Sequence, residues 1–113
     1  AGINDLTGGR SVTQMLAGVT EFADYAAAVG AKVTWVGVVP LPQTATISNR
    51  EADRRAFNTA LAQRYGTRYV DCSPQMSNAA GYLTPGLSLG PLDLHLNNAG
   101  EQALADCINA FRH

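Results

Sequence analysis

Residues 33–39, Val-Thr-Trp-Val-Gly-Val-Val, limit most strongly what this chain can fold into. They are apolar or β-branched at nearly every position, and Pro40 follows them. β-branched and aromatic side chains favour strands, and proline ends a strand because it lacks a backbone donor. A short, continuous apolar run is typical of a strand buried on both faces of a parallel sheet. The sequence therefore predicts a central parallel strand here.

Three other segments have the three- and four-residue apolar spacing of amphipathic helices: residues 12–26, 52–65 and 103–111. Each begins with a capping pattern, in which a Ser or Asn stands three residues before a Gln or Glu: residues 11–14, 48–51 and 98–101. Gly30 and Gly66 follow the first two stripes and are expected to end those helices. The members of the second stripe are predicted to face the core: Ala52, Ala56, Phe57, Ala60, Leu61 and Tyr65.

A second, shorter strand is predicted at residues 68–71. The chain then alternates strands with helices, which predicts an α/β fold with a parallel sheet. Repeats and low-complexity tracts are lacking, so we expect residues 1–113 to belong to one domain. The loop at residues 72–96 is too long for a simple connection, which favours a functional role.

The number of strands is small for such a fold. Residues 33–39 are hydrophobic enough to be central, yet only the segment around Tyr69 is available as a partner. An unpaired apolar strand edge promotes aggregation. We therefore expect this chain to be incomplete by itself.

Composition excludes several classes of function. The net charge is −1 and the chain has no basic cluster, so we expect neither a nucleic acid nor an anionic membrane surface as partner. The apolar runs are far shorter than the roughly 20 residues of a membrane span, so no transmembrane segment is expected. The two cysteines, Cys72 and Cys107, are either a disulfide, which would suit a secreted protein, or two buried thiols.

Few residues are candidates for chemistry. Of the two histidines, His113 ends the chain, whereas His95 lies at the end of the long loop, with Asp93 two residues before it. Loops at the carboxyl ends of parallel strands are where ligands gather in α/β proteins. The sequence has no metal-ligand spacing and no glycine-rich phosphate loop, so we expect no metal and no cofactor.

Two short blocks carry a family resemblance. Gly-Ile-Asn-Asp at residues 2–5, together with Asp-Leu-His-Leu-Asn-Asn-Ala-Gly at residues 93–100, resembles the SGNH hydrolases, the GDSL-type esterases and lipases. The resemblance implies a three-layer α/β/α, flavodoxin-like fold, to which this chain would supply the C-terminal strands and helices. It covers essentially the whole chain, but only the latter part of the family's domain.

The resemblance also implies catalytic roles. Asn4 would donate to the oxyanion of the tetrahedral intermediate, and His95 would be the general base. Asp5 would hold its loop by hydrogen bonds. The family's acid lies three residues before the histidine, where this chain has Leu92, so either Asp93 or a backbone carbonyl would orient His95. The alternatives are that Asn4 caps its own turn and that Asp93 is a solvated loop carboxylate.

The family's nucleophile lies in a Gly-Asp-Ser block, and a second block supplies a further oxyanion donor; this chain contains neither. No serine of the chain has such a setting: Ser11, Ser48, Ser73, Ser77 and Ser88. We therefore expect the serine to come from the N-terminal portion of the same hydrolase, as a cleaved or separate chain.

These observations predict an exported, secreted or cell-envelope ester hydrolase that acts on a small acyl ester or a lipid. Leu83, Leu87, Leu89 and Leu92 would either line an acyl site or pack at its rim. The main alternative is an inactive fragment of the family that works as a binding or assembly module. A third possibility is an unrelated flavodoxin-like domain.

Overall fold

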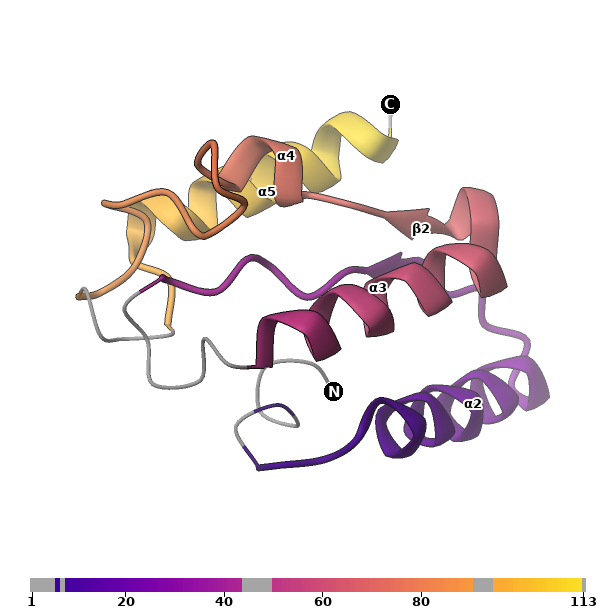
Figure 1. Cartoon of the computed structure of the whole chain (residues 1–113). Coiled ribbons are helices and arrows are strands. Elements are labelled where there is room, and N and C mark those ends of the chain that lie inside the picture. Colours follow the sequence, from indigo (N-terminus) through magenta and orange to yellow (C-terminus); the bar gives the residue numbers. More distant parts are fainter. Residues whose placement is uncertain (1–5, 7, 44–49, 91–94, 113) are drawn as a thin grey trace.

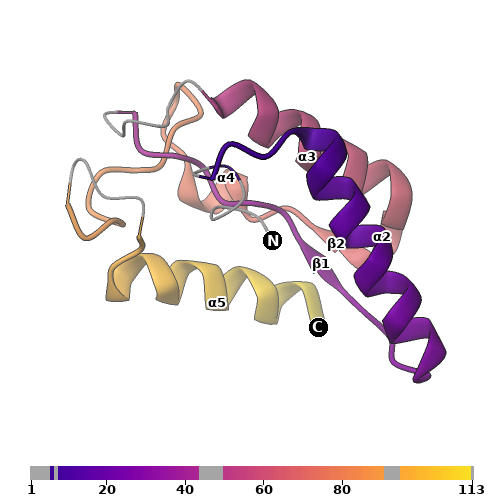
Figure 2. The same cartoon turned by 90° about the horizontal axis from the view of Figure 1, so that it is seen from below.

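Helices make up most of the described chain. The computed structural model describes residues 6, 8–43, 50–90 and 95–112. Its elements are α2 (Val12–Ala28), β1 (Trp35–Val36), α3 (Glu51–Tyr65), the 3₁₀ helix η2 (Gly66–Arg68), β2 (Tyr69–Val70), α4 (Ser73–Met76) and α5 (Asn98–Arg112). Figure 1 shows the two strands between α2 and α3 on one side and α4 and α5 on the other. Seen from below in Figure 2, β1 separates α2 from α5.

The two strands pair in parallel, with Trp35 opposite Tyr69 and Val36 opposite Val70. Successive side chains of a strand point to opposite faces, so the pair contributes to two hydrophobic clusters. Trp35 and Tyr69 pack against the first cluster, which joins α2 to α3: Leu6, Met15, Val19, Val38, Phe57 and Leu61. Val36 packs against the second, which joins β2 to α4 and α5: Val70, Cys72, Met76, Leu83 and Cys107.

The prediction of a three-layer α/β/α fold is wrong for this chain. The described chain is mostly helical, and its two parallel strands are two residues long each. The strand predicted at residues 33–39 is limited to Trp35–Val36, and both of these residues are only partly buried. Strict alternation would place Val38 on the same face as Val36. Instead Val38 joins the first cluster, while Val36 and Val39 pack against the second, so the alternation shifts by one residue after β1.

Two buried polar side chains of α3 explain where β1 ends. Asn58 accepts a hydrogen bond from the Val38 amide at 2.8 Å and donates one to the Val38 carbonyl at 2.9 Å. The Arg54 guanidinium donates to the same carbonyl at 2.9 Å. The backbone of Val38 therefore bonds to a helix instead of continuing the ladder between the strands. Of the stripe predicted for α3, Phe57 and Leu61 are buried, whereas Ala52 and Ala56 are exposed and the helix buries Arg54 and Asn58.

The first helix begins and ends as predicted. The Ser11 hydroxyl accepts from the Gln14 amide at 3.1 Å, and the Gln14 side chain accepts from the Ser11 amide at 2.9 Å, which completes the capping box. Gly30 adopts a φ of 74°, and the Ala31 amide donates to the Ala26 carbonyl. This is the Schellman motif, whose left-handed position favours glycine.

The second helix starts differently from the prediction. Ser48, which was expected to cap it, lies outside the described residues. Arg50 precedes α3, pairs with Asp53 at 2.8 Å and donates to the carbonyls of Leu6 and Arg10. The start of α3 is therefore tied to the segment before α2. Gly66 follows the helix, as predicted.

Cys72 and Cys107 form a disulfide, which settles the choice left open by the sequence. The bond joins the end of β2 to α5 inside the second hydrophobic cluster. The described part of the chain contains no helix long and apolar enough to cross a membrane.

Candidate functional site

His95 lies on a loop that we call the His95 loop, residues 86–90 and 95–97 of the described chain. The two parts of this loop lie side by side. The Leu89 amide donates to the His95 carbonyl at 2.9 Å, and the Asn97 amide donates to the Leu87 carbonyl at the same distance. Ser88 and Leu96 form an antiparallel bridge between these two bonds. The backbone of His95 is thus fixed just before α5, while its side chain is exposed.

Asn97 braces this loop from two sides. Its side-chain nitrogen donates to the carbonyls of Gly86 at 2.6 Å and Ser88 at 3.1 Å. Its side-chain oxygen accepts from the Gly100 amide at 2.9 Å, which makes Asn97 the cap of α5. The predicted cap, Asn98, is instead the first residue of the helix. An asparagine at the start of the helix could have indicated Asn97 as the cap, but its bonds to Gly86 and Ser88 leave no signal in the sequence.

Gly100 brings α5 against the same loop. A Cβ at this position would collide with the Leu87 carbonyl oxygen and would lie 3.0 Å from the Leu96 Cβ. Only glycine therefore fits this first turn of the helix without a shift. The close approach and the Asn97 bonds together fix the loop relative to α5.

Of the three predicted catalytic residues, His95 is the one that the structure describes. Asn4 and Asp93 lie outside the described residues, as do Asp5, Leu92 and His113. Their roles stay predictions. Within the described ranges, no group of three or more His, Cys, Asp or Glu side chains could hold a metal ion.

A mainly apolar cavity of about 430 Å³ lies beside the loop, lined by Pro42, Gln43, Asn78, Leu83, Thr84, Pro85, Gly86, Ser88 and Gly90. Ser88 connects the cavity to the histidine segment, because it is bridged to the residue after His95. Of the leucines predicted for an acyl site, Leu83 lines the cavity. Leu87 packs against the second hydrophobic cluster, and Leu89 is 66% exposed.

Several serines are occupied by local hydrogen bonds. Ser11 caps α2, the Ser77 hydroxyl donates to the Ser73 carbonyl at 2.7 Å, and the Ser88 hydroxyl donates to the Gly90 carbonyl at 2.9 Å. Ser48 lies outside the described residues. The hydroxyls of Ser11, Ser77 and Ser88 therefore have structural partners.

Comparison with known proteins identifies a likeness in fold. No family model matches the chain, and no curated protein matches it. A solved structure does share the fold, with a TM-score of 0.78 and 20% sequence identity. That structure is described as "a putative platelet activating factor from Streptococcus pneumonia". The match covers 97% of this chain and 56% of the other, so the chain spans little more than half the length of that protein.

Proposed function

We propose that this chain is the part of a serine ester hydrolase that carries the general base, His95. The observation that supports this best is the position of His95, which is exposed on a loop braced by Asn97 and adjoining an apolar cavity. The resemblance to the SGNH hydrolases in the blocks at residues 2–5 and 93–100 supplies the reaction type. In this proposal Asn4 is the oxyanion donor, and Asp93 or a backbone carbonyl orients His95.

The proposed reaction has two steps. In the first, His95 takes the proton of a serine hydroxyl, the serine oxygen bonds to the acyl carbon, and the ester C–O bond breaks as His95 protonates the departing alcohol. In the second, His95 takes a proton from water, whose oxygen bonds to the acyl carbon. The bond between the serine oxygen and the acyl carbon breaks, His95 returns the proton to the serine oxygen, and the acid is released. Asn4 would stabilise the oxyanion of both tetrahedral intermediates. The cavity beside the loop suits a short acyl group.

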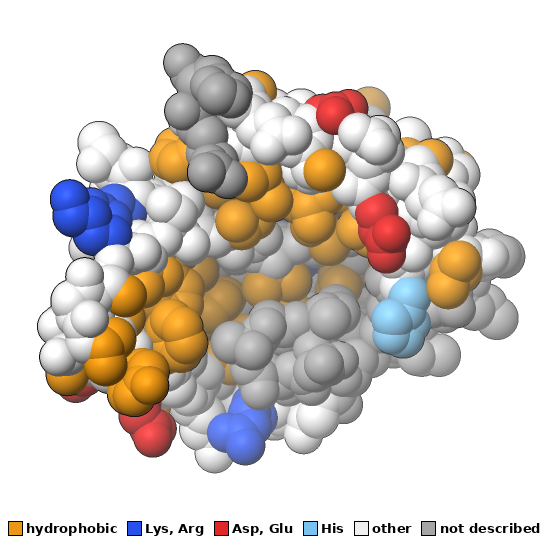
Figure 3. Space-filling view, turned by 180° about the vertical axis from the view of Figure 1, so that it is seen from behind, with side chains coloured by type: hydrophobic (Ala, Val, Ile, Leu, Met, Phe, Trp, Pro, Cys, Tyr) orange, Lys and Arg blue, Asp and Glu red, His pale blue; other side chains and the backbone are white. Residues whose placement is uncertain are grey.

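The serine itself would come from an N-terminal segment or chain that carries a Gly-Asp-Ser block. Two observations support such a partner. β1 has β2 on one edge and no described strand on the other. Figure 3 shows hydrophobic side chains lining a hollow on the face opposite to that of Figure 1. The length of the structurally similar protein leaves room for the missing portion, since 56% of it is matched.

The test is to label the native protein with a fluorophosphonate, which reacts with activated serines, and to measure hydrolysis of p-nitrophenyl acetate. We expect the label on a Gly-Asp-Ser serine outside residues 1–113, and we expect His95→Gln to abolish both labelling and hydrolysis. The matched control is Gln102→Ala, which changes an exposed residue of α5 and should preserve both. Full activity in His95→Gln would remove His95 from the mechanism.

A second candidate function is that of an inactive binding or assembly module. The observation that favours it is the exposure of large apolar side chains on and just after α2, with Phe22 at 55%, Tyr25 at 67% and Val29 at 60%. Exposed apolar groups of this kind can mark interaction sites. Two results together would favour this function over hydrolysis. The native protein would fail to react with the fluorophosphonate, and it would bind a partner chain with an affinity that Phe22→Ser lowers.

The Cys72–Cys107 disulfide is compatible with export, because such bonds persist in oxidising compartments. We propose that the protein is secreted or resides in the cell envelope. Fractionation of the cells that produce it, followed by a thiol-labelling assay on each fraction, would test this. Recovery in the reducing cytosol, with both cysteines as free thiols, would contradict it.

A further inference from the structure

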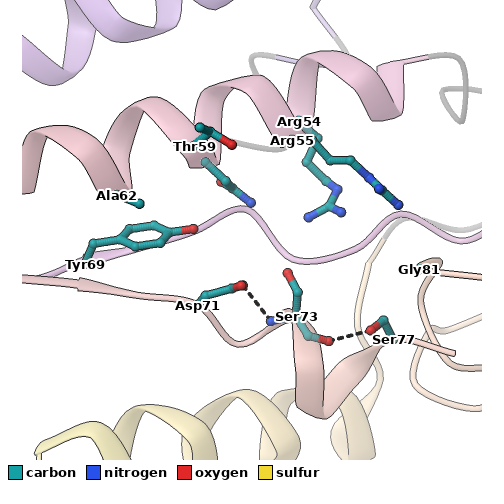
Figure 4. A pocket seen from close by; sticks show the side chains of 10 residues that line it. Arg54, Arg55, Thr59, Ala62, Tyr69, Asp71, Ser73, Ser77 and Gly81 are labelled. Atoms are coloured by element: carbon teal, nitrogen blue, oxygen red, sulfur yellow. Dashed lines mark hydrogen bonds between the residues drawn. The ribbon is translucent and has the colours of Figure 1, made fainter. Parts of the chain in front are cut away.

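A second cavity, of about 390 Å³, lies between α3 and the segment formed by β2 and α4. Figure 4 shows side chains from both walls facing the space between them. The cavity is lined by Arg54, Arg55, Asn58, Thr59, Ala62, Tyr69, Asp71, Ser73, Ser77 and Gly81. None of these residues lies in residues 86–90 or 95–97, which hold His95, or lines the cavity beside them, so this is a separate site.

Four hydroxyl groups line this cavity. That of Ser77 donates to the Ser73 carbonyl at 2.7 Å, which leaves three, those of Thr59, Tyr69 and Ser73. Within the described part of the chain, none of the three makes a hydrogen bond through its hydroxyl oxygen. Asp71 adds an acceptor, because its Oδ1 binds the Ser73 amide at 2.9 Å and its Oδ2 has no such bond in the same part of the chain. The lining therefore offers groups that both donate and accept.

The Tyr69 hydroxyl is placed by a close approach to the backbone. It lies over Gly37, where a Cβ would collide with its oxygen. Burial raises the pKa of Tyr69, and the charge of Asp71 raises it further, although Arg54 acts in the opposite direction. Tyr69 therefore stays protonated at neutral pH and can donate a hydrogen bond into the cavity.

The charges around the cavity largely cancel. Arg54 is held by Glu51 at 2.6 Å and by the Val38 carbonyl, and Arg55 is held by the same carboxylate at 3.0 Å. The terminal nitrogen of Arg55 lies against Gly81, where a Cβ would collide with it. Asp71 supplies a negative charge on the opposite wall. The two arginine charges are therefore offset by the carboxylates of Glu51 and Asp71 together, so a strongly anionic ligand gains little net attraction.

We propose that this cavity binds a neutral polyhydroxylated molecule of about monosaccharide size. Sugar hydroxyls both donate and accept, which matches the three unbonded hydroxyls, the Asp71 carboxylate and the Arg55 guanidinium. The cavity volume falls within the range of small-ligand sites, about 300–1,000 Å³. The proposal does not depend on ester hydrolysis, since the two cavities share no lining residue and none of these residues lies in residues 86–90 or 95–97.

The test is to titrate the ¹⁵N-labelled native protein with D-glucose, D-galactose and D-mannose and to follow the amide signals of Thr59, Ser73 and Gly81. A small ligand of this kind is expected to bind with a dissociation constant of order millimolar. Tyr69→Phe and Asp71→Asn each remove one hydrogen bond and should weaken binding about 3- to 10-fold. Gln102→Ala is the control and should bind like the parent protein.

The amide spectra of the variants also report whether each variant remains folded. If Tyr69→Phe does not fold, Thr59→Val, which changes an exposed position, takes its place.

Several outcomes would overturn the proposal. One is the absence of shifts at these amides with all three sugars. Another is equal binding by the parent and by both folded variants, since the sugar would then sit elsewhere. Binding of inorganic phosphate or of glycine at these amides, without binding of the sugars, would show an anion or zwitterion site instead.

Discussion

The side-chain amide of Asn58 bonds to both backbone groups of Val38, at 2.8 Å to the nitrogen and 2.9 Å to the oxygen. Buried backbone groups in proteins almost always have partners. At Val38 a helix side chain fills this role, at the point where β1 has ended. The edge of the two-strand pair and the first turns of α3 are therefore joined by polar contacts as well as by the hydrophobic cluster.

Replacing Asn58 with alanine should destabilise the protein. The Val38 amide would lose its partner in a buried site, and its carbonyl would keep only the bond from Arg54. An unsatisfied buried group costs about 1–3 kcal/mol, and we expect a loss of about 2–3 kcal/mol in the free energy of unfolding. Urea denaturation measures it. Thr59→Ala, at the exposed neighbouring position, is the control, and an equal loss in both variants would show that the Val38 bonds contribute nothing.

Glu51 should make stability depend on pH. Burial tends to raise the pKa of Glu51, but the hydrogen bonds and charges of Arg54 and Arg55 outweigh burial and lower it. A carboxyl whose pKa is lower in the folded than in the unfolded state stabilises the fold above its unfolded pKa, about 4.3 for Glu. This stabilisation is lost as the pH falls through the lowered folded value.

Glu51→Gln should therefore unfold more easily than the parent at pH 7, and the difference should shrink as the pH is lowered below about 4.3. At pH 7 we expect a loss of about 2–4 kcal/mol, because Arg54 would be left buried without its counter-charge. Urea titrations at pH 7, 5 and 3.5 or so test this. Glu21→Gln removes an exposed carboxylate of α2 and is the control. A difference that is constant across the pH range would contradict the assignment.

The sequence predicted those features that depend on local patterns. The capping box at Ser11 and Gln14 and the glycine after α2 were predicted correctly, because such signals act within one turn of helix. The pairing of Cys72 with Cys107 was one of two open possibilities, and the structure selects it.

The errors have a common physical origin in contacts between distant segments. The run at residues 33–39 has the composition of a long buried strand, but Asn58 and Arg54, some twenty residues later, bind Val38 and end the ladder early. The same two residues are buried in α3, whereas Ala52 and Ala56 of the predicted stripe are exposed. A count of apolar spacing cannot detect a polar residue whose partner is a distant backbone group.

For the candidate site, the sequence located the His95 loop and missed Asn97, whose partners at Gly86 and Ser88 become neighbours only in the fold.

Loss of the disulfide should strongly destabilise the fold. The bond closes a loop between residues 35 positions apart, and a loop of that length corresponds to about 3–4 kcal/mol in the chain-entropy estimate. We expect Cys72→Ala combined with Cys107→Ala to lower the free energy of unfolding by about that amount. Thermal denaturation of the double variant, and of the parent protein with and without dithiothreitol, tests this. An unchanged melting temperature in the double variant would refute the expectation.

Asn97 should control the order of the loop that carries His95. Replacing Asn97 with alanine removes the cap of α5 and both bonds to the loop, at Gly86 and Ser88. Loss of a capping side chain costs about 0.5–2 kcal/mol. The more specific effect is faster hydrogen exchange at the Leu89 amide, which bonds to the His95 carbonyl.

Asn98→Ala is the matched control, because Asn98 is the neighbouring exposed asparagine and lies inside the helix. Under the proposed function, Asn97→Ala should lower kcat for p-nitrophenyl acetate more than it raises KM, since the base would be misplaced rather than the substrate site. Equal exchange rates at Leu89 in the two variants would show that Asn97 does not hold the loop.

The last prediction concerns two glycines in helices that should respond oppositely to the same substitution. Gly18 lies inside α2, and a Cβ added there would have no atom within 4 Å, so Gly18→Ala should stabilise the protein by about 0.5–1 kcal/mol through helix propensity.

Gly100 lies in the first turn of α5, where propensity alone favours alanine as well. A Cβ there would meet the Leu87 carbonyl oxygen, a backbone atom of the loop braced by Asn97, so the helix and the loop would have to separate. Such overpacking costs about 1–3 kcal/mol, which exceeds the gain in propensity. Urea denaturation of both variants should therefore give changes of opposite sign, and a stabilised Gly100→Ala would mean that α5 and the His95 loop are not in close contact in the folded protein.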